Sequence, residues 1–220
     1  PHAEYVKHDE FDFGKTSRDL YDGEVAFVDQ QVGRLLDFIK GSDLDKNTVI
    51  LITADHGEAF GEHGLIRHGF EIWEELVRVP LIVHVPGADA VRIKQARSGI
   101  DIVPTIMQVL GLPAPSGEGD DFISGQSLLP DVIQPPGYKP QSRIVFIDMP
   151  AGPNNAERQA LIEDDLKLIV SGGRPLGLYN LREDPAEKKD LLDDAELKEK
   201  ELGRFKAFRK KLRVVPVRPQ

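Results

Sequence analysis

Residues 47–57 read NTVILITADHG, an apolar run that ends in an aspartate, a histidine and a glycine. The run is rich in β-branched residues and lacks polar alternation, which is typical of a strand covered on both faces, as in a parallel sheet flanked by helices. Ligands of open α/β sheets bind beyond the carboxyl ends of the strands. Asp55 and His56 occupy that position, so this stretch predicts both a fold and the place of a site.

The sequence on either side of this run also indicates an α/β fold. Upstream, residues 16–40 carry apolar side chains at alternating four- and three-residue steps, the spacing of one buried helix face. Downstream, residues 79–85 form a second apolar run, VPLIVHV, and Asp101 can cap a helix over residues 102–110. Helices and strands therefore alternate in the first half of the chain. His84, within the second apolar run, is expected in the core.

The character of the sequence changes after residue 112. The stretches LPAPSGEGDD and LPDVIQPPGYKPQS are rich in proline, glycine and acidic residues, which indicates surface connections and a boundary between residues 130 and 141. Beyond it, short strand-like runs separated by turns such as SGGRP predict an antiparallel sheet, and residues 195–212 predict a final amphipathic helix. We therefore expect a first unit over residues 1–135 and a small α+β unit over residues 136–220.

Composition narrows the classes of partner. The chain has 220 residues, a formal net charge of −9 and no cysteine. The negative charge and the lack of a basic cluster argue against a nucleic-acid surface. Without cysteine there is no disulfide and no thiolate ligand, and no apolar run approaches the roughly 20 residues that cross a bilayer. The sequence predicts neither the localisation nor the oligomeric state.

Histidines gather in the loop after the first apolar run, where His56, His63 and His68 stand among glycines. A carboxylate and an imidazole at adjacent positions, Asp55 and His56, can ligate one cation if the loop turns at once, which Gly57 permits. Two ligands are too few for a hydrolytic metal site, so the missing ligands are expected outside this sequence. The alternative is that the pair is a hydrogen-bonded brace of the loop.

The stretch TADHGEAFGEHGLIRHG, followed by WEELVRVPLIVHVPG, resembles the C-terminal half of the sulfatases within the alkaline phosphatase superfamily. The order of motifs extends to PHAEY near the start, to DIVPTIMQVLGLPAP and SGQSLLP, and to LKLIVSGGRPLGLYNLREDPAEKKDLL, which covers nearly the whole chain. The resemblance implies an α/β fold: an alkaline-phosphatase-like, helix-flanked and mostly parallel sheet, present in part, with a small C-terminal antiparallel sheet and a terminal helix.

The resemblance also implies roles for single residues. Asp55 and His56 match the two distal metal ligands of the family, and His2, in PHAEY, matches a histidine near the sulfate ester. His68 falls where many sulfatases have a lysine and related phosphotransferases a histidine, and it can protonate a leaving group. His63 either contacts substrate or shapes its loop. The remaining polar residues of this loop, which either orient the histidines or are solvated surface, are Glu58, Glu62 and Arg67.

The activity that the resemblance implies is metal-dependent hydrolysis of a small-molecule or glycan sulfate ester. Calcium is the first metal by family, with manganese, magnesium or zinc as alternatives. The family's upstream paired-aspartate motif and nucleophile segment are not in this sequence, so the chain is expected to be a fragment that is inactive alone. Two alternatives stay open: a phosphotransferase or phosphodiesterase of the same superfamily, which His68 favours, and a non-catalytic binding fragment.

Overall fold

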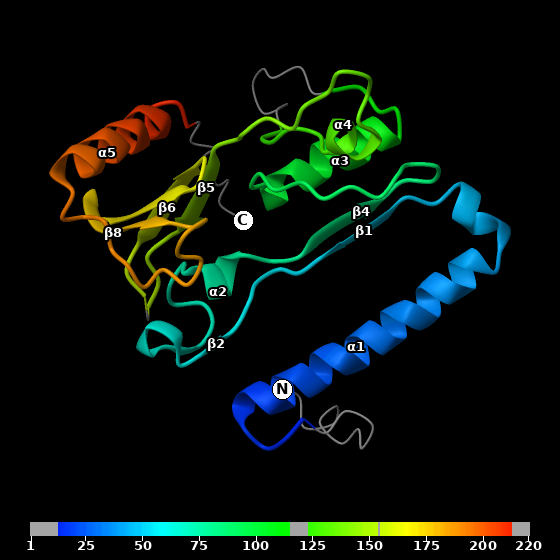
Figure 1. Cartoon of the computed structure of the whole chain (residues 1–220), viewed down its shortest axis with the longest axis horizontal. Helices are drawn as coiled ribbons and strands as arrows, with labels where there is room; N and C mark the ends of the chain where they lie inside the picture. The colour runs from blue at the N-terminus through cyan, green and yellow to red at the C-terminus, as the bar shows by residue number, and fades with distance from the viewer. Residues whose placement is uncertain (1–12, 115–122, 154, 213–220) are drawn as a thin grey trace, which may run out of the picture.

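The structure is a computed structural model that describes residues 13–114, 123–153 and 155–212 (Figure 1). The N-terminal region, as we call residues 13–112, contains α1 (Ser17–Lys40), η2 (Asp43–Lys46), β1 (Ile50–Thr53), β2 (Ala59–Phe60), η3 (Glu62–Gly64), β3 (Ile66–Arg67), α2 (Glu74–Val77), β4 (Leu81–His84), η4 (Gly99–Asp101) and α3 (Ile102–Val109). The C-terminal region, residues 143–212, contains β5 (Val145–Met149), β6 (Arg158–Glu163), β7 (Leu166–Ser171), β8 (Arg174–Asn180) and α5 (Ala195–Arg209). The short helix α4 (Leu129–Ile133) lies between them in the chain.

The helix α1 begins at a capping box. The Thr16 hydroxyl accepts the Asp19 N–H at 3.2 Å, and the Asp19 carboxylate accepts the Thr16 N–H at 2.9 Å. The helix confirms the predicted element, but the predicted burial of one face does not occur, because none of its residues is buried and Phe38 is 65% exposed. Near its start, an ion pair of Arg18 with Glu62 joins α1 to the loop after β2. No helix in the described part of the chain is long and apolar enough to span a membrane.

Strand β1 pairs with β4, and the two run antiparallel, with Ile50 opposite His84. The predicted parallel pairing therefore does not occur between these two strands. Parallel strands need a crossover connection, whereas residues 54–80 form a small hairpin and one helical turn that return the chain in the opposite direction. The predicted cover on both faces is also incomplete, since Ile82 is 56% exposed. His84, at the end of β4, is exposed. The sequence pattern predicted this residue in the core, and that prediction is wrong.

The C-terminal sheet has the order β5-β6-β7-β8, with every neighbouring pair antiparallel, which confirms the predicted antiparallel sheet. Side chains alternate between its faces, as they must along a strand. One face packs against α5, with a core of Leu161, Leu168, Val170, Leu178 and Phe205. The other face packs against the segment that leads into α2, with a core of Ile72, Ala160, Ile169 and Tyr179. The sheet is thus covered by α5 on one face and by the N-terminal region on the other (Figure 1).

A buried lysine joins the sheet to α2. Lys167 on β7 is fully buried, and its Nζ donates to the Ile72 carbonyl at 2.8 Å and to Glu74 Oε1 at 2.9 Å. The same Nζ lies 3.0 Å from Glu187 Oε1, with which it forms an ion pair. Glu187 in turn accepts the Glu74 N–H at 2.6 Å. A buried charge is tolerated only when it is paired, so this triad of Lys167, Glu74 and Glu187 fixes α2 against the sheet.

A second buried network, of charged side chains, joins the end of the N-terminal region to the start of the C-terminal region. Asp101 begins α3 as predicted, but its carboxylate accepts the Gln126 N–H at 2.8 Å and does not cap that helix. Arg97 donates two parallel bonds to Asp131, at 2.7 and 2.9 Å, and Arg143 lies 3.1 Å from Asp101. The predicted boundary at residue 135 stays a prediction, and the Arg143 contact crosses it.

Candidate active site

Asp55 and His56 follow directly after β1. The Oδ2 atom of Asp55 lies 3.7 Å from Nε2 of His56, and both side chains are open to solvent. The Nδ1 atom of His56 lies 2.8 Å from the Gly57 carbonyl oxygen. Because a carbonyl oxygen can only accept, Nδ1 carries the proton and Nε2 of the neutral ring has a free lone pair. One oxygen and one nitrogen donor therefore lie close enough to bind a single cation.

Gly57, the residue after this pair, lies directly against the backbone of α2, and the chain bends at Asp55. Its N–H donates to the Leu76 carbonyl of α2 at 2.8 Å. A Cβ at this position would lie 2.0 Å from the Glu75 carbonyl oxygen, far inside van der Waals contact. Only glycine fits so close to another backbone, and α2 therefore sets the path of the loop that carries Asp55 and His56.

His68 stacks on His56, with ring centroids 4.0 Å apart and an angle of 27° between the planes. Its Nδ1 lies 3.1 Å from Glu58 Oε2, which is an acceptor when ionised, so Nδ1 donates and Nε2 stays open. The structure thus brings three of the predicted site residues together. The sequence left Glu58 undecided between an orienting role and solvated surface, because a glutamate in a polar loop gives no signal of its own partner.

His63 points elsewhere. The hairpin of β2 and β3 returns the chain, and His63 at its tip has a left-handed backbone with φ of 51°. Its Nδ1 lies 2.9 Å from Glu75 Oε1, its Nε2 lies 3.1 Å from the Glu187 carbonyl oxygen, and its ring stacks on Trp73 at 4.0 Å. Both ring nitrogens are therefore occupied by protein groups. A substrate contact of His63 stays a prediction that would require these bonds to break.

His2, the other predicted catalytic residue, lies outside the described residues. Across the described part of the chain, no cluster of three or more His, Cys, Asp or Glu side chains could hold a metal. The oxygen of Asp55 and the nitrogen of His56 fit a divalent cation as part of a ligand set. Calcium takes about six to eight oxygen ligands, so the predicted metal needs further donors.

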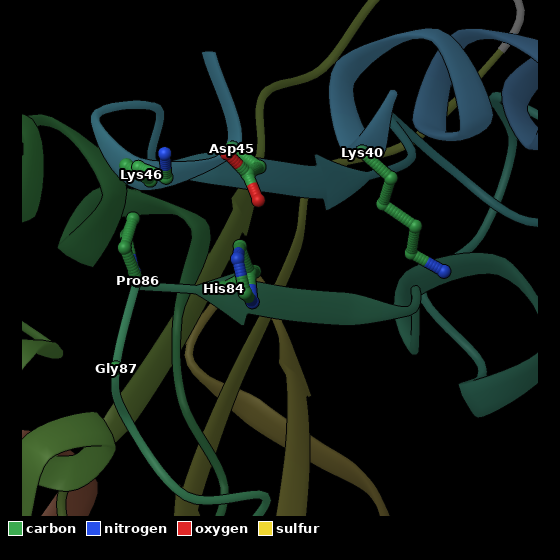
Figure 2. A pocket seen from close by; sticks show the side chains of 6 residues that line it. All are labelled: Lys40, Asp45, Lys46, His84, Pro86 and Gly87. Carbon is green, nitrogen blue, oxygen red and sulfur yellow. The ribbon is translucent and has the colours of Figure 1, made fainter. Parts of the chain in front are cut away.

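A cleft of about 570 Å³ lies at the other end of the β1–β4 ladder (Figure 2). Its lining offers one carboxylate, Asp45, which points towards His84. These two residues come from separate elements, η2 and β4, whereas Asp55 and His56 are adjacent in one loop. Lys46 is engaged at the surface with Asp43 at 3.1 Å. Asp55 and His56 are therefore a better candidate for a metal site than this cleft. The residues that line the cleft are Lys40, Asp45, Lys46, His84, Pro86 and Gly87.

Comparison with protein families gives two matches. A model described as "Sulfatase" matches residues 1–112, and one described as "N-sulphoglucosamine sulphohydrolase, C-terminal" matches residues 61–213. An N-acetylglucosamine-6-O-sulfatase of Bacteroides thetaiotaomicron is 31% identical over 195 residues, which cover 83% of this chain and 33% of that protein. The chain spans about a third of the length of the curated relatives it matches.

Solved structures share the fold. A protein in complex with its substrate D-glucosamine-2-N,6-O-disulfate is 29% identical, with a TM-score of 0.67 over 88% of this chain and 40% of that one. The phosphonate monoester hydrolase of Agrobacterium radiobacter is 25% identical, with a TM-score of 0.69 over 88% of this chain and 40% of that one. These likenesses confirm the alkaline-phosphatase-like α/β class, with its small antiparallel sheet and terminal helix.

Proposed function

The chain belongs to the sulfatase family of the alkaline phosphatase superfamily, and we propose that it forms the C-terminal part of a metal-dependent sulfuric ester hydrolase. The observation that carries this proposal is the pair at the end of β1. The Asp55 carboxylate lies 3.7 Å from His56 Nε2, and the bond of His56 Nδ1 to the Gly57 carbonyl leaves that Nε2 free to ligate. A solvated loop would not require such an arrangement.

Asp55 and His56 would hold a divalent cation together with donors from outside the described residues. Calcium is our first choice by family, whereas the imidazole donor also suits manganese or zinc, and magnesium is a further option. When bound, the cation would supply positive charge to the ester oxygens and lower the pKa of the nucleophile. We place that nucleophile outside these 220 residues, because the sequence lacks the family's nucleophile segment.

His68 would contact the ester and protonate its leaving oxygen. The bond from Nδ1 to Glu58 fixes the ring, and the stack on His56 holds it beside the proposed metal ligands. Its Nε2 is the nitrogen left to face substrate, and an imidazolium there can act as a general acid. His2 would be a second substrate-contacting histidine, as the resemblance of PHAEY implies.

The substrate class that we propose is a sulfated glycan. Support comes from the relative named N-acetylglucosamine-6-O-sulfatase and from the 29% identical structure in complex with a disulfated glucosamine. The second candidate is a phosphate or phosphonate ester. It is favoured by the likeness to a phosphonate monoester hydrolase and by the histidine at position 68, where many sulfatases have lysine.

The test uses the whole open reading frame that encodes this sequence, with release of sulfate from glucosamine 6-sulfate measured beside hydrolysis of a phosphonate monoester. Asp55→Asn should lower metal content and turnover together. His68→Ala should lower turnover by about 10²–10⁴-fold, the usual contribution of a general acid, and leave the metal in place. His84→Ala, in an exposed histidine outside the site, is the matched control and should change neither.

Two outcomes would overturn parts of this proposal. Loss of the metal in His68→Ala would make that residue a ligand and not a substrate contact. Faster hydrolysis of the phosphonate than of the sulfate ester would select the second candidate. The 220-residue chain alone should show no turnover of either substrate, and turnover that His56→Ala abolishes would show that it carries its own nucleophile.

A further inference from the structure

Both ring nitrogens of His63 face groups that accept hydrogen bonds. Nδ1 lies 2.9 Å from a carboxylate oxygen of Glu75, and Nε2 lies 3.1 Å from the backbone carbonyl oxygen of Glu187. A backbone carbonyl has no proton to donate, and neither has an ionised carboxylate. Each ring nitrogen must therefore be a donor. Only the doubly protonated, positively charged imidazolium can donate from both nitrogens.

The ring's other neighbours favour that charge. Trp73 lies flat against it, with centroids 4.0 Å apart and an angle of 5° between the planes, an arrangement in which a cation meets the negative face of an indole. The side chains of His63 and Glu75 are both mostly buried. Burial lowers the pKa of His63, but the bonds to Glu75 and to the Glu187 carbonyl, with the charges of both glutamates, outweigh burial and raise that pKa.

The charges around the ring come from every element that packs against it. Most of the charged groups close to the ring are acidic. The pKa of Asp184 is lowered mainly by hydrogen bonds from the Lys189 and Lys188 backbones, and the positive charge of His63 makes a smaller contribution in the same direction. Tyr179 stays neutral, because burial first and nearby acidic groups second raise its pKa to about 12. The titratable and charged groups here are Glu62 in the His63 loop, Glu74, Glu75 and Arg78 in and after α2, Lys167 on β7, Tyr179 on β8, and Asp184, Glu187 and Lys188 after β8.

The contact joins two strained backbones. His63 and Glu187 both have left-handed conformations with φ of 51°, which L-residues other than glycine adopt only at an energetic cost. Such conformations persist where surrounding contacts hold them. The bond from His63 Nε2 to the Glu187 carbonyl is one of these contacts. It attaches the tip of the β2–β3 hairpin to the C-terminal region.

We propose that His63 is a charged imidazolium that latches the β2–β3 hairpin onto the loop after β8, and that loss of its proton as the pH rises opens this contact. A neutral ring has one N–H, so it keeps the bond to Glu75 or the bond to the Glu187 carbonyl and loses the other. The latch concerns the fold of the chain and does not depend on the proposed catalytic function. It makes the junction of the two regions sensitive to pH.

The direction of the pH effect follows from the raised pKa. A histidine whose folded pKa lies above its ordinary value of 6.5 contributes stability that is fully present below pH 6.5. That contribution is lost as the pH rises through the folded pKa. The latch should therefore be closed below pH 6.5 and should open as the pH rises through the folded pKa of His63.

The first experiment follows the side-chain ¹⁵N and ¹H signals of the histidines by NMR as the pH rises from about 5 to about 9, the range in which histidines titrate. We expect His63 to show protons on both ring nitrogens and to titrate above the ordinary histidine pKa of 6.5. Glu75→Gln should lower the midpoint of His63, because it removes the charge of one bonded carboxylate. A His63 that titrates at or below pH 6.5, or whose midpoint does not change in Glu75→Gln, would refute the latch.

The second experiment measures unfolding by urea across the same pH range. His63→Phe keeps a ring against Trp73 and removes both N–H groups, so its loss of stability should be largest in acid and should shrink as the pH rises. A His63→Phe gap that is constant with pH would mean that the charge contributes nothing. If that variant does not fold, the NMR titration with Glu75→Gln still decides the question.

Discussion

The two regions of this chain differ in how they are held together. In the C-terminal region, four paired strands carry a hydrophobic core on each face, one of them covered by α5, and even the lysine on β7 is buried and paired. In the N-terminal region, α1 buries no residue, β1 pairs with β4 alone among the described strands, and the predicted metal ligands are open to solvent. The stable region and the region with the candidate chemistry are thus not the same.

The connection between the regions explains how the site keeps its shape. The triad of Lys167, Glu74 and Glu187 fixes α2 against the C-terminal sheet. The Leu76 carbonyl of α2 accepts the N–H of Gly57, the residue that follows Asp55 and His56. The sheet therefore supports the site through α2. Local opening should be cheaper in the N-terminal region than in the sheet, because fewer apolar contacts have to be broken.

The largest effect is expected from the buried lysine. Lys167→Met keeps the volume of the side chain but leaves Glu74 and Glu187 as buried charges without a partner, which should lower the free energy of unfolding by about 4–5 kcal/mol. Lys188→Met, in an exposed lysine of the adjacent loop, should stay within about 0.5 kcal/mol of the parent protein. Urea unfolding measures both. Equal costs for the two variants would show that the triad does not join the regions.

Phenylalanines on the two terminal helices compare the regions directly. Phe205 of α5 lies in the sheet's core, so Phe205→Ala should lower the free energy of unfolding by about 3–4 kcal/mol. Phe38 of α1 is largely exposed, and Phe38→Ala should cost about 0.5 kcal/mol or less. The same urea experiment applies. A similar cost at both positions would mean that α1 packs against a surface in solution.

Sequence patterns predicted the local elements better than their surroundings. The strands of the C-terminal sheet and the helices α1, α3 and α5 were predicted, because periodicity reports which residues can share a face. The same periodicity misled at His84 and on α1. An apolar pattern shows that a face can be buried, but whether anything covers it depends on residues far away in the chain. The direction of β4 was missed because the sequence of residues 54–80 did not reveal the small hairpin and the single helical turn that return the chain antiparallel to β1.

The proposed metal ligands could be predicted from the sequence, but the residues that contact and orient the histidines could not. Asp55 and His56 could be chosen because their chemistry and their place after a strand can be read from the sequence. The partner of His68 could not, because Glu62, Glu71 and Glu74 all lie closer to it in sequence than Glu58 does. The engagement of His63 with Glu75 and Glu187 was also hidden, since Glu187 is distant in the chain and belongs to the other region.

An intermediate effect is expected at the junction of the two regions. Arg97 forms a two-pronged bond to the buried Asp131, so Asp131→Asn should lower the free energy of unfolding by roughly 3 kcal/mol at neutral pH. Burial raises the pKa of Asp131, but the bonds from Arg97 and Tyr138 outweigh burial and lower it. Asp43→Asn, in a fully solvated carboxylate, is the control and should have little effect.

The pH dependence of that variant gives a second measurement. A carboxylate with a lowered pKa contributes stability above its ordinary pKa of 3.8 and loses it as the pH falls through the folded value. The gap between the parent protein and Asp131→Asn should therefore be constant near neutral pH and should close in acid below about pH 4. A gap that widened in acid would contradict the assignment of Asp131 as an ionised partner of Arg97.

A smaller and local effect is expected at the start of α1. Thr16→Ala removes the hydroxyl that caps the helix, which should destabilise α1 by about 1 kcal/mol. Because α1 buries no residue, this loss should speed amide hydrogen exchange within α1 and leave exchange in β6 and β7 unchanged. Ser17→Ala, one residue later, is the matched control. Slower or unchanged exchange in α1 would show that the Thr16 cap does not stabilise the helix. Faster exchange in the sheet would show that the two regions are more tightly coupled than their packing indicates.

The smallest effect is expected at the candidate site itself. Asp55 is 89% exposed, and its one described backbone bond, from the His56 N–H to Oδ1 at 3.0 Å, can be made equally well by an asparagine oxygen. Asp55→Asn should therefore change the free energy of unfolding without metal by no more than about 0.5 kcal/mol, as for other surface substitutions. Loss of the negative charge should still weaken binding of calcium or manganese, measured by isothermal titration calorimetry on the longest chain that binds metal. A side chain that matters for metal but not for folding is what a ligand should be, and the hydrogen-bonded brace makes the opposite prediction, a loss of stability with no change in metal affinity.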